Sequence, residues 1–103
     1  MKLFEVVTNE FLSIVEILEE TETVENNRII IHREYFRKLL EKYQYLTFRE
    51  KTKIYKDLNF IIHDKNNYTM PYKDKELGKT VRKVIINYNT YLTIKKLIKI
   101  NMD

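Results

Sequence analysis

Three basic side chains in the middle of the chain have the spacing of a contact surface for a polyanion. Arg49, Lys53 and Lys56 stand at positions i, i+4 and i+7, which lie on one side of an α-helix. Arginine can donate a fork of hydrogen bonds to guanine edges, whereas lysine mainly neutralises phosphate. The opposite side of this helix carries apolar residues, which are Phe48, Tyr55 and Leu58. The pattern is compatible with a helix that lies against nucleic acid and also with an ordinary solvated helix face.

Charge is distributed unevenly along the 103 residues, whose formal net charge is +4. Residues 1–31 carry seven acidic and two basic residues, whereas residues 32–103 carry eight acidic and 17 basic ones. An acidic front and a basic back are compatible with a protein that contacts a polyanion with one part only. The length indicates a single domain over residues 1–103.

The segments of the chain that would position these side chains differ in pattern. Apolar residues have helical spacing in some segments and a strand-like pattern in others, which predicts an α+β fold. The predicted helices span residues 3–20, 32–46, 48–58 and 90–100. A Thr-x-x-Glu capping box, Thr47 and Glu50, begins the third helix. Asn89 is the expected cap of the last helix, for which a strand is the alternative. The predicted strands span residues 28–31, 59–63 and 80–87.

The segment between the last two strands has the composition of a hairpin. Residues 64–67 have turn chemistry, and residues 68–73 should be an extended edge segment because Pro71 cannot donate to a ladder. The tip should lie at residues 74–79, which hold the only glycine. Helical spacing also fits residues 76–88, so a helix there is the alternative to the last strand.

The first predicted helix, residues 3–20, has a wide apolar stripe with glutamates opposite it. A stripe of this width can serve a core, or a core plus a partner surface. We therefore expect it to bind a protein partner or a second copy of the chain through Phe4, Val7, Phe11 and Ile14.

The order of helix, strand, two helices, strand, hairpin, strand and helix resembles that of a winged helix-turn-helix domain. The segment "YKDLNFIIHDKNNYT", residues 55–69, is similar to winged-helix segments of phage and mobile-element replication proteins, such as the small partner of cassette-encoded primase-polymerases. The turn "YQYLT", residues 43–47, departs from the family because it contains no glycine.

This resemblance implies that helix 48–58 enters the major groove and that a wing over about 64–79 contacts the backbone or the minor groove. Thr52 would lie beside the basic stripe at the groove. The hairpin and its returning strand would add further basic contacts, which are Lys65, Lys73, Lys75, Lys79 and Arg82.

A second set of side chains suits a different nucleic acid. Tyrosines interleaved with lysines can form a stacking platform for a single strand. The candidates lie in the basic half and are Tyr68, Tyr72, Tyr88 and Tyr91. Tyrosines pack more often at the edge of a small core with the hydroxyl in water.

The sequence offers little for catalysis. It has no cysteine and two histidines, His32 and His63, without metal-ligand spacing around them. Gly78 stands alone, so a glycine-rich phosphate loop is missing. No apolar run reaches the roughly 20 residues of a membrane span, and the first residues do not resemble a secretory signal. We expect a cytoplasmic protein without enzymatic activity, cofactor or metal.

These observations lead to two functional hypotheses. The first is a DNA-binding winged-helix accessory protein of replication or regulation in a phage or mobile element, partnered with a larger enzyme such as a polymerase. The second is a protein-binding inhibitor or dimeric interaction module that acts through the acidic first helix. The choice between single- and double-stranded DNA stays open from the sequence.

Overall fold

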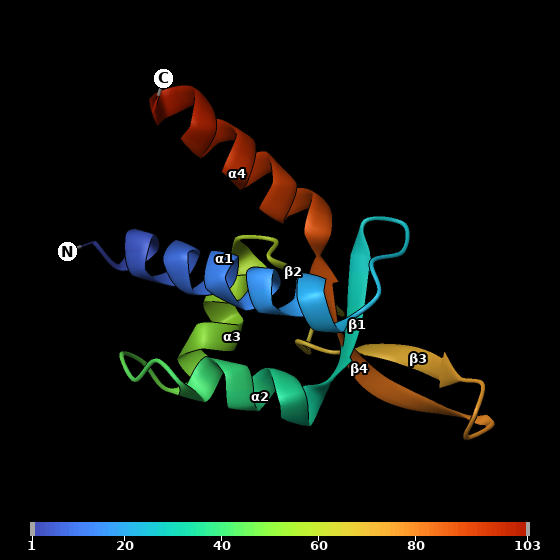
Figure 1. Ribbon diagram of the computed structural model, residues 1–103. Helices are drawn as coiled ribbons and strands as arrows, with labels where there is room; N and C mark the ends of the chain where they lie inside the picture. Colours follow the sequence, from blue (N-terminus) through green and yellow to red (C-terminus); the bar gives the residue numbers. More distant parts are fainter. Residues whose placement is uncertain (1, 103) are drawn as a thin grey trace.

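The computed structural model describes residues 2–102, and over these residues the chain has four helices and one small, open, antiparallel sheet of four strands (Figure 1). This confirms the expected α+β class. The helices are α1 (Leu3–Thr21), α2 (Arg33–Glu41), α3 (Phe48–Asp57) and α4 (Tyr88–Met102). The strands are β1 (Arg28–His32), β2 (Ile61–Ile62), β3 (Met70–Asp74) and β4 (Lys79–Asn87).

Strand β4 organises the sheet, because every other strand pairs with it. Its second half pairs with β1 on one side, where Ile29 lies opposite Ile86. On its other side, the second half of β4 pairs with β2. The first half of β4 pairs with β3, where Tyr72 lies opposite Val81. The hairpin of β3 and the first half of β4 therefore extends beyond the part of the sheet that the helices cover (Figure 1).

The strand prediction for residues 80–87 is confirmed, and the alternative helix over 76–88 is wrong. Three consecutive β4 residues, Val84, Ile85 and Ile86, are buried. Consecutive side chains of a strand point to opposite faces, so this part of β4 is covered on both of them. β-branched side chains favour such a strand over a helix.

The stripe of α1 belongs mainly to the core, which corrects the expectation of a partner surface there. Val7, Phe11 and Ile14 are at most 1% exposed, whereas Phe4 is 61% exposed. The Phe11 ring stacks on that of Phe60, with 4.1 Å between centroids. Truncating a buried phenylalanine typically costs about 3–5 kcal/mol, so these positions serve stability.

Helix α2 is shorter than predicted, since it ends at Glu41 and not near Leu46. The turn to α3 needs no glycine. Among the described residues, positive φ occurs at Asn26, Asn27, Asn59 and Gly78, and none of these lies in that turn. The glycine-free "YQYLT" is therefore compatible with the observed backbone.

Asparagines shape two other connections. Asn26 and Asn27 both have positive φ, as a tight two-residue hairpin turn requires, and they lead α1 into β1. Asn59 also has positive φ and ends α3, which limits the predicted strand 59–63 to Ile61–Ile62. Helix α4 begins at Tyr88, where Asn87 Oδ1 accepts a hydrogen bond from Thr90 N, so the capping role expected of Asn89 falls to Asn87.

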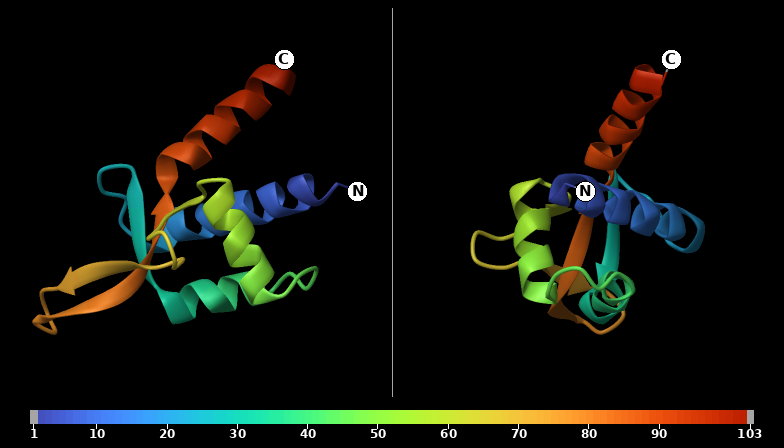
Figure 2. Two further views of the ribbon diagram at one scale, coloured as in Figure 1. Left: turned by 180° about the vertical axis from the view of Figure 1, so that it is seen from behind. Right: turned by 90° about the vertical axis from the view of Figure 1, so that its left-hand side faces the viewer.

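The first and last helices meet near the sheet and diverge toward the two chain ends (Figure 1; Figure 2). They are joined where Glu19 accepts hydrogen bonds from the hydroxyls of Tyr88 and Tyr91. The turn that ends α3 lies beside the start of α4, where Asn59 O accepts a hydrogen bond from Thr90 Oγ1 at 3.0 Å, and the two helices extend from there in different directions (Figure 2).

Candidate nucleic-acid interface

Helix α3, which carries the basic stripe, is fixed at both ends by local hydrogen bonds. Thr47 Oγ1 accepts from Glu50 N at 3.1 Å, and Glu50 Oε1 accepts from Thr47 N at 3.1 Å, which completes the predicted capping box. These bonds from Thr47 hold the pKa of the Glu50 carboxyl below its usual value. At the other end, Phe60 N donates to Tyr55 O and Asn59 N to Lys56 O, a glycine-type helix stop made by asparagine.

The three stripe residues lie together on the outer side of α3. Arg49 and Lys53 are exposed and Lys56 is half-buried. They line a shallow groove of about 650 Å³ whose other wall comes from α2 and from the loop after β2, through Arg37, Asn66, Asn67 and Tyr68. The groove thus gathers four basic side chains from two helices with amide groups that can donate and accept hydrogen bonds.

Arg37 is a member of this surface that sequence reasoning missed. Its guanidinium lies over the Phe48 ring, with 4.5 Å from Cζ to the centroid. Arginine stacked in this way is held in place while its donors stay available. The local sequence does not reveal it, because only the packing of α2 against α3 brings Arg37 to the groove.

Thr52 lines the groove, as predicted, but it is nearly buried there. It is 7% exposed, and its Oγ1 donates to the Arg49 carbonyl oxygen at 3.0 Å. A hydroxyl engaged with its own helix backbone contributes to packing there. Its neighbour Lys53 keeps its exposure but pairs loosely with Asp57 at 3.3 Å, a surface contact of small energetic weight.

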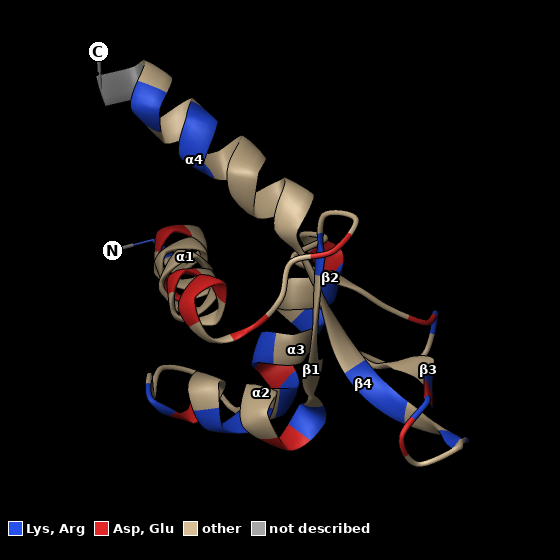
Figure 3. Ribbon diagram, turned by 45° about the vertical axis from the view of Figure 1, so that its right-hand side comes forward, with Lys and Arg blue, Asp and Glu red and all other residues tan. Residues whose placement is uncertain are grey.

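The hairpin of β3 and β4 carries three of the predicted contact lysines. Lys73, Lys75 and Lys79 are exposed on it, and Lys65 is exposed in the loop that precedes it. Figure 3 shows basic residues along this hairpin and at the far end of α4, with acidic residues along α1. Arg49, Lys53 and Lys56 therefore lie on a different element from these lysines, with the loop of residues 63–69 between them.

The hairpin tip is ordered by Asp74. Its Oδ1 accepts from the backbone N–H groups of Leu77 and Glu76 at 3.0 and 2.9 Å, and Gly78 has φ +65° where the chain returns to β4. The bond from Leu77 is the main cause that lowers the pKa of the Asp74 carboxyl. The expected tip at 74–79 is thus confirmed.

Arg82, a predicted nucleic-acid contact, is engaged with the loop before β3, although its side chain is 35% exposed. Its guanidinium donates to Thr69 Oγ1 at 2.7 Å and Thr69 O at 2.8 Å, and it pairs with the Asp64 carboxylate. The side chain therefore ties β4 to both ends of the loop that leads from β2 to β3. Its role is to position the hairpin base.

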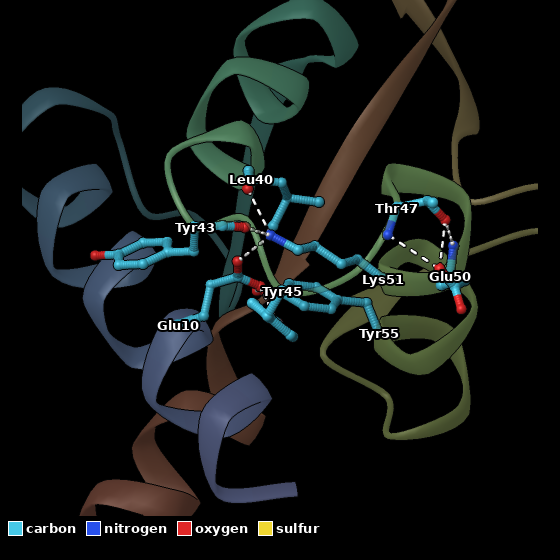
Figure 4. A network of polar contacts seen from close by, with 8 residues as sticks. All are labelled: Glu10, Leu40, Tyr43, Tyr45, Thr47, Glu50, Lys51 and Tyr55. Atoms are coloured by element: carbon cyan, nitrogen blue, oxygen red, sulfur yellow. Dashed lines mark hydrogen bonds and ion pairs between the residues drawn. The ribbon is translucent and has the colours of Figure 1, made fainter. Parts of the chain in front are cut away.

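A buried polar network, also missed from the sequence, holds α3 against α1 and α2 (Figure 4). Lys51 Nζ lies 2.7 Å from Glu10 Oε2, donates to Leu40 O at 2.6 Å and also reaches Tyr43 O. Glu10 Oε1 accepts the hydroxyls of Tyr45 and Tyr55 at 2.8 and 2.7 Å. Burial, followed by the Glu10 charge, raises the pKa of Tyr55 well above its usual value.

This network attaches α3, the helix that carries the basic stripe, to α1 and to the end of α2. Lys51 satisfies carbonyl groups at the end of α2, where a cation is favourable. The same side chain is anchored on α1 through Glu10. One buried ammonium group therefore ties α3 to both neighbouring helices.

The tyrosines do not gather into one stacking platform. Tyr91 is fully buried, and the hydroxyls of Tyr88 and Tyr91 both donate to Glu19. The hydrogen bond from Tyr88 to Glu19 is the main cause that raises the pKa of Tyr88 to about 12. Tyr68 packs on Phe36 and Phe48, and Lys83 lies over the Tyr72 ring. These rings serve packing in separate places.

Metal ligation and membrane insertion are not indicated by the described residues. Among the residues that the structure describes, no three His, Cys, Asp or Glu side chains converge as metal ligands would. In the same part of the chain, every helix is too short or too polar to cross a bilayer. His63 Nδ1 instead lies 2.7 Å from the Asp64 carbonyl oxygen.

Comparison with known proteins adds no family assignment. No protein-family model matches the chain, and no curated protein matches it significantly.

Proposed function

We propose that the chain is a winged helix-turn-helix protein that binds double-stranded DNA through α3 and the β3–β4 hairpin. In this proposal α2 and α3 are the helix-turn-helix pair, α3 is the recognition helix and the hairpin is the wing. The order of elements and the pairing of β1, β2 and β3 with β4 support the assignment.

The observation that carries the proposal is the gathering of Arg37, Arg49, Lys53 and Lys56 around one groove beside α3. Basic residues of a solvated face have no reason to converge from two helices. Phosphate oxygens provide the charge that such a set would neutralise, and Arg49 has the donor geometry for a guanine edge. We favour duplex DNA over a single strand because the tyrosines needed for stacking are used in packing.

The broader role that we propose is that of a cytoplasmic, non-enzymatic accessory protein in replication or regulation of a phage or mobile element. It rests on the sequence resemblance of residues 55–69 and on the absence of a catalytic constellation from the residues described. A larger replication enzyme, such as a polymerase, is the partner that this role implies.

The test is fluorescence anisotropy of a labelled duplex and of its single strand, at several salt concentrations. We expect micromolar or tighter binding to the duplex that weakens steeply with salt, because phosphate contacts release counterions. Arg49→Glu and Lys53→Glu should each weaken this binding at least tenfold.

The matched control is Arg28→Glu, which makes the same change of charge at an exposed site on β1, outside the groove. This variant should bind nearly as well as the parent. Circular dichroism and thermal melting establish that all three variants are folded. Equal weakening by all three would reduce the effect to net charge and would contradict the recognition-helix assignment, as would unchanged binding by folded Arg49→Glu.

A further inference from the structure

The outer half of α4 is an apolar surface that packs against no other part of the chain among the residues that the structure describes. Ile94 of α4 packs against the core, whereas every residue from Lys95 to Ile100 is exposed. Large apolar side chains are nevertheless frequent there, and Leu97 and Ile100 are 55% and 62% exposed. The start of α1 adds Leu3 and Phe4, also exposed. Apolar patches of this kind mark interaction sites.

The helical state of this segment also calls for a packing partner. Isolated helices shorter than about 12–15 residues are marginal in water, because most helix stability in proteins comes from burial of an apolar face. The part of α4 beyond Ile94 is about two turns long, and the helix points away from the sheet (Figure 1). Something that covers Leu97 and Ile100 would stabilise it.

Charge indicates the chemistry of such a partner. Helix α4 contains no acidic residue and carries Lys95, Lys96 and Lys99 on its outer half, whereas α1 contains no basic residue. Within the described residues no ion pair joins α1 to α4, and the two helices diverge toward their chain ends (Figure 2). A partner for α4 should be both apolar and acidic, and the first turns of α1, with Phe4 beside Glu5, have both properties.

We infer that the chain forms a symmetric homodimer in which the outer half of α4 from each copy packs against the start of α1 of the other. The contact is self-complementary, because each copy supplies one basic and one acidic apolar helix, and a two-fold axis then repeats it. It uses a surface distinct from the α3 groove and does not depend on DNA binding.

Interface size supports the use of both helices. A stable interface buries about 800 Å² on each partner. Half of the lateral surface of a 15-residue helix, about 22 Å long and about 10 Å across, is only about 350 Å². Packing α4 against α4 alone would therefore bury much less than this, and its outer half would bury less still, so a stable contact needs the exposed start of α1 as well.

The first experiment is sedimentation velocity of the full chain over a range of protein and salt concentrations. We expect a reversible dimer of twice 12.7 kDa, which loses affinity with rising salt because exposed charges are screened. Leu97→Asp with Ile100→Asp should shift the chain to the monomer. The matched control is Leu77→Asp at the hairpin tip, which removes an equally exposed leucine and should leave the dimer intact.

Because the chain contains no cysteine, cross-linking can test the pairing directly. One preparation carries Phe4→Cys and another carries Leu97→Cys, so any mixed disulfide must join two copies. We expect the mixed product to form faster than either same-site product, and faster than a product between Leu97→Cys and Leu77→Cys. A monomer at about 100 µM, or a dimer that survives Leu97→Asp with Ile100→Asp, would overturn the inference. So would a dimer without the mixed cross-link.

Discussion

Lys51 and Glu10, 41 positions apart, form an ion pair with 2.7 Å between Nζ and Oε2, and both side chains are at most 2% exposed. Each ion has further hydrogen-bonding partners: carbonyl groups of Leu40 and Tyr43 for Lys51, and the hydroxyls of Tyr45 and Tyr55 for Glu10. The desolvation of two charges is offset only when such partners are complete. Both ions have such partners here, so loss of either one would leave the other buried and uncompensated.

Breaking this pair should be the most damaging single change that keeps the core volume. Lys51→Met leaves the Glu10 carboxylate buried without its counter-ion, and loss of one partner of a buried pair costs about 3–5 kcal/mol. We expect a drop of this size in the free energy of unfolding, measured by urea titration.

The control for Lys51→Met is Lys53→Met, which removes an exposed i, i+4 pair and should cost less than about 0.5 kcal/mol. The double variant Lys51→Met with Glu10→Met should cost less than the sum of the two single variants. Additive losses would show that the two charges do not interact in the folded protein.

The sequence predicted those parts of the fold in which a local pattern decides the outcome. The apolar spacing of residues 3–20 corresponds to α1, the β-branched run corresponds to β4, and the Thr47–Glu50 box begins α3. In each case the determining interactions lie within a few residues of one another.

Lys51 and Glu10 were missed because their interaction is long-range. Each stands within an apolar stripe, Lys51 between Phe48 and Tyr55 and Glu10 between Val7 and Ile14. A charged residue at such a position signals a buried partner of opposite charge, but a local window does not identify the partner.

The predicted nucleic-acid contacts differ in their surroundings for a similar reason: some follow from local spacing, and others depend on long-range pairing. The exposure of Arg49 and Lys53 follows from helical spacing, whereas Arg82 pairs with Asp64 across the sheet, 18 positions away. The four predicted partner-binding residues of α1 differ in their burial. Val7, Phe11 and Ile14 are buried in the core, while Phe4, in the first turn of α1, is 61% exposed.

Removing the Arg82 brace should loosen the hairpin base without unfolding the domain. Arg82→Gln loses the charged contact with Asp64 and most donors to Thr69. We expect faster amide hydrogen exchange at residues 63–73, with little change in α1 or in the buried half of β4. The comparison variant is Lys79→Gln, an exposed change at the hairpin end of β4. Equal exchange rates in parent and Arg82→Gln would show that the brace does not order the loop.

Acid should weaken the start of α3 through Glu50. Bonds from Thr47 lower the folded-state pKa of Glu50 below its usual 4.5, and its unfolded-state pKa is not lowered in this way. The stabilising contribution is therefore present above the unfolded-state pKa and is lost as the pH falls through the folded-state pKa. Urea midpoints measured from about pH 6 to about pH 3 should fall more steeply for the parent than for Glu50→Gln.

Glutamine keeps the capping geometry but cannot titrate, so the two curves should converge in acid. The control is Glu41→Gln, at the end of α2, whose curve should follow that of the parent. Parallel acid slopes for the parent and Glu50→Gln would contradict the role assigned to the capping carboxylate.

Hairpin lysines should contribute to DNA affinity as phosphate contacts, uniformly across sequences. On the proposed function, Lys73, Lys75 and Lys79 neutralise backbone charge, and each contact contributes roughly −0.9 to the slope of log affinity against log salt. Replacing all three with glutamine should make that slope shallower by about 2–3 and weaken binding equally for unrelated duplexes. Arg49→Gln should instead act unequally, because a guanine-reading arginine contributes about 1–3 kcal/mol of base discrimination. If the triple variant changed sequence preference and left the salt slope unaltered, the hairpin would be reading bases, and the roles given to α3 and to the hairpin would have to be exchanged.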